Sequence, residues 1–367
     1  MTAAAPRLLL ISDFTIAGLA PYLASGDEPR IEASTAPFDQ VVPVLLDAGA
    51  GCWSPRPDAA FVWTRPQSIR AFARAAGNDP VAIDDLLSDV DAFADAVIGA
   101  AGRAGSIFVA SWTMPAYERG LGMLNFDPKV GLAYLIGRMN LRLAERFSGH
   151  RTIHLLDAAR WQALAGSAGV NPKLWHLGKI AFGPEVLQHA AADLKAGLAA
   201  TRGRTRKLVV VDLDETLWGG VVGDVGWQQL RLGGHDAFGE AYVAFQRALK
   251  RLTRRGIVLA IVSKNTEAIA LEAIDQHPEM VLRRDDFVGW RINWQDKAAN
   301  IAELAAEINL GLDSVVFIDD NPAERARVRG ALPDVLVPEW PADKLLYEQA
   351  LASLTCFDTL TVSDEDR

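Results

Sequence analysis

The chain has 367 residues, of which 50% are apolar and 23% charged, enough material for two hydrophobic cores. Its formal net charge of −9 argues against a nucleic-acid-binding surface. No stretch approaches the length of a membrane span, and the short apolar run after Met1 is interrupted too soon for a signal peptide. Two cysteines 304 positions apart form no disulfide framework or metal motif, so we expect a cytoplasmic protein without a membrane partner.

Four short apolar runs in the N-terminal half predict buried strands, with helical patterns between them, most clearly over Val130–Phe147. A helix is also expected over Thr15–Leu23, with Ser12 or Asp13 as its cap. This alternation is typical of an α/β domain with a mostly parallel sheet, which we assign to residues 1–195. The predicted strands are Arg7–Ile11, Ala59–Trp63, Ser106–Ala110 and Thr152–Leu156.

The domain boundary is expected where an Ala-rich helical pattern gives way to Gly and basic residues. We assign residues 196–206 to a linker and residues 207–367 to a second α/β domain. The densest basic run, Arg202–Lys207, lies at this boundary. We interpret it as a solvated linker, with a docking patch for an acidic carrier protein as the alternative.

Two carboxylates one residue apart follow the first strand of the second domain. The β-branched run Lys207–Val211 predicts a buried central strand, and Asp212 and Asp214 come directly after it. Because ligands bind at the carboxyl ends of parallel strands, both side chains are expected in that crevice. One carboxylate could attack phosphorus while the other handles the proton of the leaving group.

A second strand pattern ends in groups that suit phosphate binding. The run Ile257–Val262 leads directly into Ser263, Lys264 and Asn265 at a helix start. Their hydroxyl and backbone N–H groups would hold a phosphate there.

The remaining groups come from the last third of the chain. Lys297 begins another helical pattern and supplies a fixed cation for a phosphoryl group. The strand pattern Ser314–Ile318 ends in Asp319 and Asp320, hard oxygen ligands that suit Mg²⁺.

Short spacings leave no room for a large cap domain. There are 48 residues between Asp214 and Ser263 and 33 between Ser263 and Lys297, which the helices and strands of the sheet nearly fill. An uncapped site accepts a bulky substrate, such as a carrier protein that presents a phosphopantetheine arm. The Gly-rich stretch Trp218–Gly234 is expected to form a hairpin flap, with its tryptophans either packing within it or contacting substrate.

The ordered motifs resemble the haloacid dehalogenase (HAD) superfamily of phosphatases and phosphotransferases, which implies a Rossmann-like second domain. Members of its FkbH-like branch are associated with loading a glyceryl unit from 1,3-bisphosphoglycerate onto an acyl carrier protein, with loss of phosphate. The resemblance is dense from Lys207 to Pro341 and departs from the family pattern at Glu215, where Asn is usual. Similarity to that branch is carried by Asp214–Gly223, Ser263–Asn265, His277–Met280, Arg291–Trp294, Asp296–Lys297 and Phe317–Pro322.

The resemblance implies a role for each motif residue. Asp212 would be the nucleophile that forms an aspartyl phosphate, and Asp214 the general acid and then base. Mg²⁺ would bind Asp212, the backbone carbonyl of Asp214, and Asp319, while Asp320 would either support these ligands or cap the next helix. The groups expected to bind the phosphoryl oxygens are Thr216, Ser263, Lys264, Asn265 and Lys297.

The N-terminal half is similar to the SGNH-hydrolase-like region that FkbH-like proteins carry, which implies a flavodoxin-like sheet with Ser12 at the nucleophile position. The Asp-x-x-His pair of such hydrolases is missing, because Lys173 stands three residues before His176. We therefore expect no hydrolase activity from Ser12. His176 is interpreted as a packing histidine with satisfied polar atoms.

Cys52 is a candidate acyl relay, because a thiolate accepts an acyl group readily from an acyl phosphate. The alternative is a small buried hydrophobe beside Trp53. Cys356 is expected in the core of the C-terminal helical pattern.

With the resemblance, the sequence predicts a Mg²⁺-dependent enzyme that dephosphorylates 1,3-bisphosphoglycerate and loads glyceryl onto an acyl carrier protein, in secondary-metabolite or polysaccharide biosynthesis. The alternatives are a stand-alone small-molecule phosphatase and a non-catalytic scaffold that binds carrier proteins.

Overall fold

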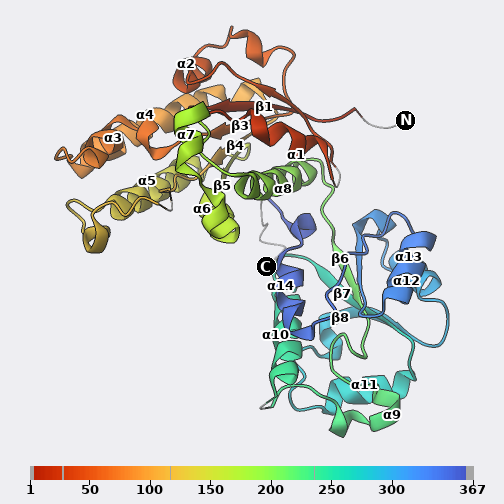
Figure 1. Ribbon diagram of the computed structural model, residues 1–367. Coiled ribbons are helices and arrows are strands. Elements are labelled where there is room, and N and C mark those ends of the chain that lie inside the picture. Colours follow the sequence, from red (N-terminus) through yellow and green to blue (C-terminus); the bar gives the residue numbers. More distant parts are fainter. Residues whose placement is uncertain (1–3, 27–28, 116, 235, 361–367) are drawn as a thin grey trace. The chain divides into compact units, whose positions relative to one another are not determined.

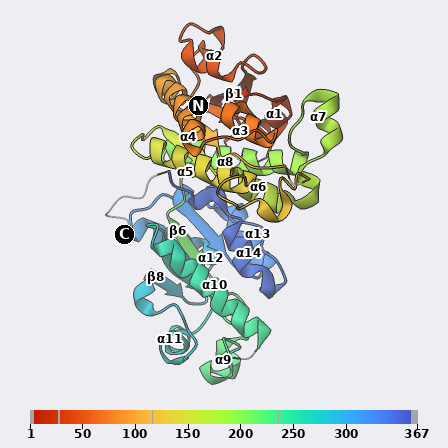
Figure 2. The same ribbon diagram turned by 90° about the vertical axis from the view of Figure 1, so that its left-hand side faces the viewer.

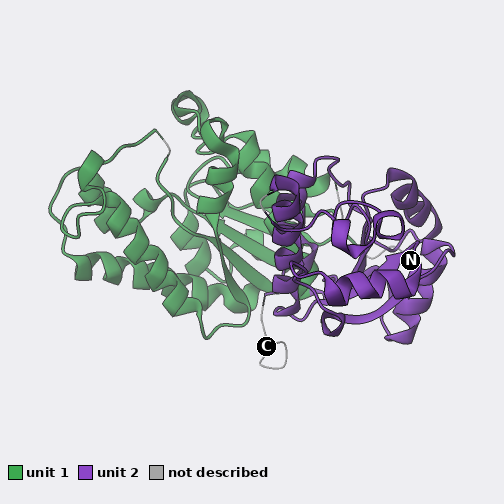
Figure 3. Ribbon diagram, turned by 90° about the horizontal axis from the view of Figure 1, so that it is seen from below, with its two compact units in different colours: residues 1–201 green, residues 202–367 purple. Residues whose placement is uncertain are grey.

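The chain divides into two compact units, Met1–Thr201 and Arg202–Arg367 (Figure 3). The structure, a computed structural model, describes residues 4–26, 29–115, 117–234 and 236–360. Each unit contains a parallel sheet flanked by helices, so the predicted α/β class is confirmed. Within the described ranges, no helix combines the length and apolar character needed to cross a bilayer.

The sheet of unit 1 has the strand order β2-β1-β3-β4-β5, and all of its pairings are parallel. The first strand therefore lies inside the sheet, with Ser12 paired to Trp63 at the carboxyl end. Strand β2 was not predicted, because its four residues are largely exposed at the sheet edge. The strands are β1 Arg7–Ser12, β2 Glu32–Thr35, β3 Ala59–Trp63, β4 Ser106–Ala110 and β5 Ile153–Leu156.

Helices cover both faces of this sheet (Figures 1 and 2). One core joins the sheet to α2, α3, α4 and α5. On the other face, Trp161 of α6 contacts Phe61, and α8 approaches so closely at Gly197 that a Cβ there would lie 2.7 Å from Phe108. The helices are α1 Ala20–Ala24, α2 Val41–Leu46, α3 Arg70–Ala76, α4 Ile83–Ala100, α5 Leu132–Phe147, α6 Ala158–Ala165, α7 Pro172–Gly178 and α8 Pro184–Thr201.

The sheet of unit 2 has the order β8-β7-β6-β9, again with all pairings parallel. Strand β6, the first of this unit, is fully buried because its side chains face cores on both sides of the sheet. The edge strand β8 was not predicted, since its central residues are only half-buried. The strands are β6 Leu208–Val211, β7 Val258–Ser263, β8 Phe287–Ile292 and β9 Val315–Ile318.

Two groups of helices flank this second sheet (Figure 1). Helices α10, α11 and α14 contribute to the larger core, and α12 and α13 to the smaller one. Among the described residues, the segments between these strands hold single helices and short turns and no cap domain, as the spacings predicted. The helices are α9 Val222–Val225, α10 Ala237–Thr253, α11 Glu267–Gln276, α12 Lys297–Glu307, α13 Pro322–Ala331 and α14 Tyr347–Ala352.

Three local predictions are wrong. The stretch Trp218–Gly234 is not a β-hairpin, because it forms α9 and a 3-10 turn, with one antiparallel bridge between Gly219 and Arg231. The helix expected over Thr15–Leu23 is a 3-10 turn followed by α1, and no side chain caps either. Residues 196–201, assigned to the linker, belong to α8.

The basic run at the unit boundary is not wholly solvated. The guanidinium of Arg206 is half-buried and donates a 2.8 Å hydrogen bond to the carbonyl of Asp334. Burial lowers the pKa of Arg206, with acidic neighbours opposing. Arg206 therefore anchors the start of unit 2.

Candidate active site

Two adjacent strands of unit 2 bring the predicted carboxylates together. Val211 of β6 pairs with Ile318 of β9, so the next residue of each strand, Asp212 and Asp319, follows at the same sheet edge. The Asp212 amide donates to the Ile318 carbonyl at 3.0 Å, which fixes this register past the end of β6. Both aspartates are buried.

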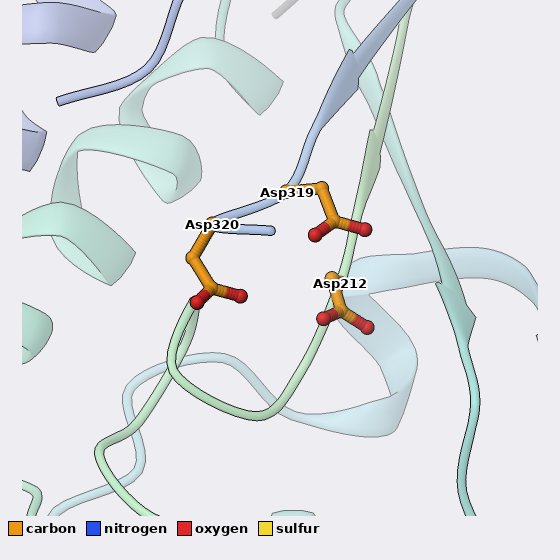
Figure 4. Close-up of side chains that lie close together, drawn as sticks. All are labelled: Asp212, Asp319 and Asp320. Carbon is orange, nitrogen blue, oxygen red and sulfur yellow. The ribbon is translucent and has the colours of Figure 1, made fainter. Parts of the chain in front are cut away.

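The carboxylates of Asp212, Asp319 and Asp320 converge (Figure 4). Each offers one oxygen, and the three oxygens lie within 4.8 Å of one another. Hard oxygen atoms in a group this tight are the donor set that Mg²⁺ and Ca²⁺ prefer. The cluster combines one residue that follows β6 with two that follow β9.

Lys297, the first residue of α12, supplies positive charge to this cluster. Its ammonium lies 2.6 Å from Asp319 Oδ2 and 3.0 Å from Asp212 Oδ1, and its side chain is buried. Asp296 caps the helix by accepting from Ala298 N and Ala299 N, which fixes the position from which Lys297 leaves. Sequence reasoning correctly placed Lys297 at a helix start.

Burial and mutual repulsion make the cluster electrostatically costly. Burial raises the pKa of Asp319 to about 6, repulsion from Asp212 adds to this rise, and Lys297 opposes it. Burial also raises the pKa of Asp320. Burial alone would lower the pKa of Lys297, but the two nearby carboxylates outweigh it and raise that pKa. Three carboxylates near Lys297 and, at Asp320, near Lys344 leave negative charge that a cation would neutralise.

The surroundings of one Asp212 oxygen are compatible with a divalent cation. Asp212 Oδ1 is buried and lacks a hydrogen-bond partner among the described residues, because Lys297 Nζ is in ion-pair contact but not in hydrogen-bond geometry. Buried polar atoms are normally satisfied. A cation bound by the three carboxylates would satisfy this one.

Asp214 is held apart from that cluster by three hydrogen bonds. Its Oδ1 accepts from Trp218 Nε1 at 2.8 Å and from Val222 N at 3.0 Å, and its Oδ2 accepts from Asn265 Nδ2 at 2.8 Å. Burial raises the pKa of the Asp214 carboxyl, although these donors oppose the rise. Its side chain is thus not a cluster ligand, and the expected ligation through its backbone carbonyl stays a prediction.

Glu215 shapes the turn between Asp214 and Thr216. Its φ of 56° lies in the left-handed region, which side chains rarely adopt. Its Oε1 accepts from Gly220 N at 2.6 Å, and its carbonyl accepts from Lys344 Nζ at 2.8 Å and Tyr347 Oη at 3.2 Å. These contacts hold a strained turn in place.

Sequence reasoning missed two cations that support the site. Lys344 Nζ also lies 3.5 Å from Asp320 Oδ2, so it links the Glu215 turn to the cluster. The buried Arg325 donates to the carbonyls of Asp319 and Asp320 at 2.8 and 2.7 Å. Arg325 could have been predicted from its position, one turn into the helix that follows Asp319 and Asp320. No sequence pattern near Lys344 indicated its role.

The predicted phosphate-binding residues have different surroundings. Ser263 is buried at the carboxyl end of β7, beside β6. Thr216 Oγ1 accepts from Asp320 N at 3.2 Å. The ammonium of Lys264 pairs with Glu324 at 2.6 Å, and its predicted role in phosphate binding stays a prediction. The cap expected of Asp320 is wrong, because Asn321 caps α13.

No described residue of unit 1 activates the thiol of Cys52. It is half-buried in a 3-10 turn, where burial raises the pKa of its thiol and the charge of Asp47 raises it further. A thiol needs a lowered pKa, or a base, to act as a nucleophile near neutral pH. The buried-hydrophobe alternative fits this environment better. Cys356 packs partly buried against the larger core of unit 2, and burial raises its pKa to about 12.

Ser12 and Asp13 are engaged at the end of β1. Ser12 Oγ accepts from Phe14 N at 3.1 Å, and Asp13 accepts from Arg65 N and Nε at 3.0 and 3.1 Å. Neither caps a helix. The interpretation of His176 as a packing histidine is wrong, because it is exposed on α7.

Comparison with known proteins includes a strong structural similarity. No model of a known protein family matches the chain, and neither does any curated protein. The N-terminal part of the Bacteroides fragilis protein BF1531, which contains a phosphatase domain and was solved with Mg, is 28% identical, with a TM-score of 0.87 over 97% of this chain and 94% of that one.

A second structure is 3-deoxy-D-manno-octulosonate 8-phosphate phosphatase from Moraxella catarrhalis, in complex with magnesium, phosphate and KDO. It is 19% identical over 45% of this chain and 93% of its own, and its TM-score of 0.27 is too low to carry an argument. The similarity to BF1531 supports the fold and a phosphatase-type architecture. The FkbH-like branch and the SGNH-like N-terminal region stay predictions from the sequence.

Proposed function

We propose that this protein is a Mg²⁺-dependent HAD-like enzyme that dephosphorylates a phosphorylated three-carbon acyl donor, 1,3-bisphosphoglycerate, and loads glyceryl onto an acyl carrier protein. The observation that carries the phosphoryl-transfer part is the buried cluster of Asp212, Asp319 and Asp320 beside Lys297. The Mg-bound phosphatase-containing structure of BF1531 supports the same reading. The carrier and donor rest on the sequence resemblance.

In this proposal Asp212 and Asp214 have separate tasks. Asp212 Oδ attacks phosphorus in line with the ester oxygen, the P–O ester bond breaks, and Asp214 donates a proton to the departing alkoxide. Asp214 then takes a proton from water, which attacks the aspartyl phosphate and releases phosphate. Burial favours a protonated Asp214 before the first step.

Positive charge and positioning provide the rest of the stabilisation. Lys297 lies where it would pair with the transferring oxygens, and Ser263 ends the neighbouring strand. Mg²⁺ bound to the three carboxylates would offset the charge of the phosphoryl group and keep Asp212 ionised. Asn265 and Trp218 hold Asp214 in one orientation through its two oxygens.

Acyl transfer is a different reaction from phosphate-ester cleavage. The carrier thiolate would attack the carbonyl carbon of the acyl phosphate, and the bond from that carbon to the phosphate oxygen would break with release of phosphate. Asp212 and Asp214 would remove the second phosphate from the other end of the donor. The thiol of the phosphopantetheine arm suffices for the first reaction, whereas a relay through Cys52 would need activation that its surroundings do not provide.

The test is intact-mass analysis of a phosphopantetheinylated acyl carrier protein incubated with the enzyme, Mg²⁺ and 1,3-bisphosphoglycerate generated in situ. We expect the carrier to gain one glyceryl mass with the wild-type protein, and no dephosphorylated product with Asp212→Asn. Asp275→Asn, which alters an exposed ion pair with Arg284 in the same unit, is the matched control.

Other results of this experiment would favour the alternative functions. Phosphate release with an unmodified carrier would leave a stand-alone phosphatase. Carrier binding without any turnover would leave a scaffold. Loss of carrier loading in Cys52→Ala, with phosphate release intact, would establish the relay against the expectation stated above.

A further inference from the structure

Unit 1 contains a cavity of about 290 Å³ at the carboxyl ends of its strands. Thr64 and Arg65, which follow β3, and Thr113, which follows β4, line one side, and Trp175 of α7 and Phe182 line another. In open parallel sheets, ligands bind beyond the carboxyl ends of the strands, and the lining that follows β3 and β4 lies at those ends. The cavity has the position and the size of a small-molecule site.

Arg65 is fixed in this cavity with one edge unoccupied. Its Nε and backbone N bind the buried Asp13, and its guanidinium stacks on Trp175 with the carbon 3.9 Å from the ring centroid. Its two Nη atoms have no hydrogen-bond partner within the described part of the chain. A guanidinium held in this way presents parallel N–H donors, the geometry that binds a carboxylate through both oxygens.

The two threonine hydroxyls are also prepared as donors. Thr64 Oγ1 accepts from Trp112 Nε1 at 2.9 Å, and Thr113 Oγ1 accepts from Gln162 Nε2 at 2.6 Å. A hydroxyl that already accepts a hydrogen bond still has its own hydrogen to donate. Neither hydroxyl donates a hydrogen bond to another described residue. Thr64 is nevertheless buried, with only 4% of its surface exposed. Together with the Nη atoms of Arg65, these two hydroxyls offer donors to a ligand that accepts hydrogen bonds.

The charge around the cavity favours one acidic group over a highly charged ligand. Arg65 is partly neutralised by Asp13, Lys179 Nζ lies 4.9 Å from the centroid of the Trp175 ring, and Glu118 is an exposed part of the lining. Phe182 stacks on Trp63 and presents an apolar wall. The lining thus combines one donor-rich end with an aromatic and aliphatic body.

We propose that unit 1 binds a small organic acid in this cavity, with its carboxylate on the Nη atoms of Arg65 and the Thr64 and Thr113 hydroxyls, and its apolar part against Trp175 and Phe182. Asp13 is a positioning residue, because it acts by orienting Arg65. This site does not use the carboxylate cluster of unit 2 and does not depend on the proposed phosphoryl transfer. Ser12 is not among the residues that line it.

The test compares acids with their neutral amides by saturation-transfer NMR on the full-length protein. The probes are butyrate, hexanoate and 3-phenylpropionate, each paired with its primary amide, which keeps the shape and removes the charge. We expect at least one acid to bind saturably and about tenfold or more tightly than its amide, since charge-assisted hydrogen bonds supply that difference.

Two variants locate the binding. Arg65→Gln and Trp175→Ala should each weaken binding of that acid about tenfold or more, whereas Trp294→Ala, which removes an exposed tryptophan from unit 2, should not change it. Arg65→Gln leaves Asp13 buried without its cation, so this variant can fail to fold. In that case, the effect of Trp175→Ala on acid binding is the test of the proposal. The proposal is overturned if no acid binds, if every amide binds as well as its acid, or if binding survives in Trp175→Ala.

Discussion

The two units use the same architecture and differ in what they place at the end of the first strand. In unit 1, Asp13 follows β1 and both of its oxygens are taken by Arg65. In unit 2, Asp212 follows β6, and one of its buried oxygens lacks a hydrogen bond while Asp319 and Asp320 crowd against it. In each unit the parallel sheet places a buried carboxylate directly after its first strand. The side chains on the neighbouring strands determine whether the oxygens of that carboxylate are hydrogen-bonded or available for chemistry.

The partners of each carboxylate follow from strand order. Strand β6 lies beside β9, whose carboxyl end carries two more aspartates, so charges of one sign accumulate. Strand β1 lies beside β3, which is followed by threonine and arginine, so Asp13 meets an opposite charge. The first arrangement suits a cation and a phosphoryl group, and the second suits an anion.

The largest expected effect comes from Asp212. Asp212→Asn keeps the shape of the side chain and removes the charge and nucleophilicity of its free oxygen, so phosphate release should fall by about a thousandfold or more. Circular dichroism and the Tm would establish that the variant is folded. Phosphate release within tenfold of the wild-type rate would contradict the difference between the two strand ends, since Asp212 would then be no more reactive than Asp13.

Removal of Mg²⁺ is the next test. Chelation should abolish phosphate release, and added Mg²⁺ should restore it and raise the Tm, because binding to the folded state alone stabilises by about 2.7 kcal/mol at a hundred times Kd. Asp319→Asn should lose most of this Tm shift. A Tm independent of Mg²⁺ in the wild-type protein would count against the carboxylate cluster as a metal site.

Asn265 is expected to matter less than the carboxylate it holds. Asn265→Ala removes one hydrogen bond to Asp214 Oδ2, which should lower kcat about ten- to a hundredfold. Asn300→Ala is the control, because Asn300 is also buried in unit 2 but bonds to Asn293 instead. Equal losses in the two variants would reduce the role of Asn265 to general stability.

Lys344 should have a smaller effect on turnover. Lys344→Met removes the ammonium that joins the Glu215 carbonyl to Asp320, and we expect about a tenfold fall in kcat as the turn that carries Asp214 loosens. Lys250→Met breaks a comparable ion pair with Asp286 and serves as the matched control. A fall in Tm with kcat unchanged would limit Lys344 to a structural role.

Asp13 should affect stability and leave the chemistry of unit 2 alone. Asp13→Ala leaves the backbone N–H and Nε of Arg65 without their acceptor, at a cost of about 1–3 kcal/mol in the free energy of unfolding. Chemical denaturation would measure it. A loss of phosphate release comparable to that of Asp212→Asn would show that the two strand ends do not have separate roles.

The sequence identified the buried strands and the motif residues of unit 2 because continuous β-branched runs mark central parallel strands. It missed β2 and β8, since both lie at sheet edges and carry exposed or half-buried polar residues that break the apolar pattern. It also took the Gly-rich stretch after Trp218 for a hairpin, where the local hydrogen bonds close helical turns.

Contacts distant in sequence were beyond such reasoning. Lys344 stands 129 positions after Glu215, and no local pattern links the two. The site of unit 1 depends on Arg65 meeting both Asp13 and Trp175, which only the folded chain brings together. His176 was misread because apolar neighbours in the sequence do not ensure burial on a short, exposed helix.

The most direct test of the central claim is capture of the phosphorylated enzyme. The wild-type protein would be mixed with Mg²⁺ and a phosphate-ester substrate, quenched rapidly in acid and digested, and its peptides analysed by mass spectrometry. We expect a phosphoryl group on Asp212 in the wild-type protein and none in Asp212→Asn. Phosphate release without a phosphoryl group on Asp212, or labelling that persists in Asp212→Asn, would contradict it.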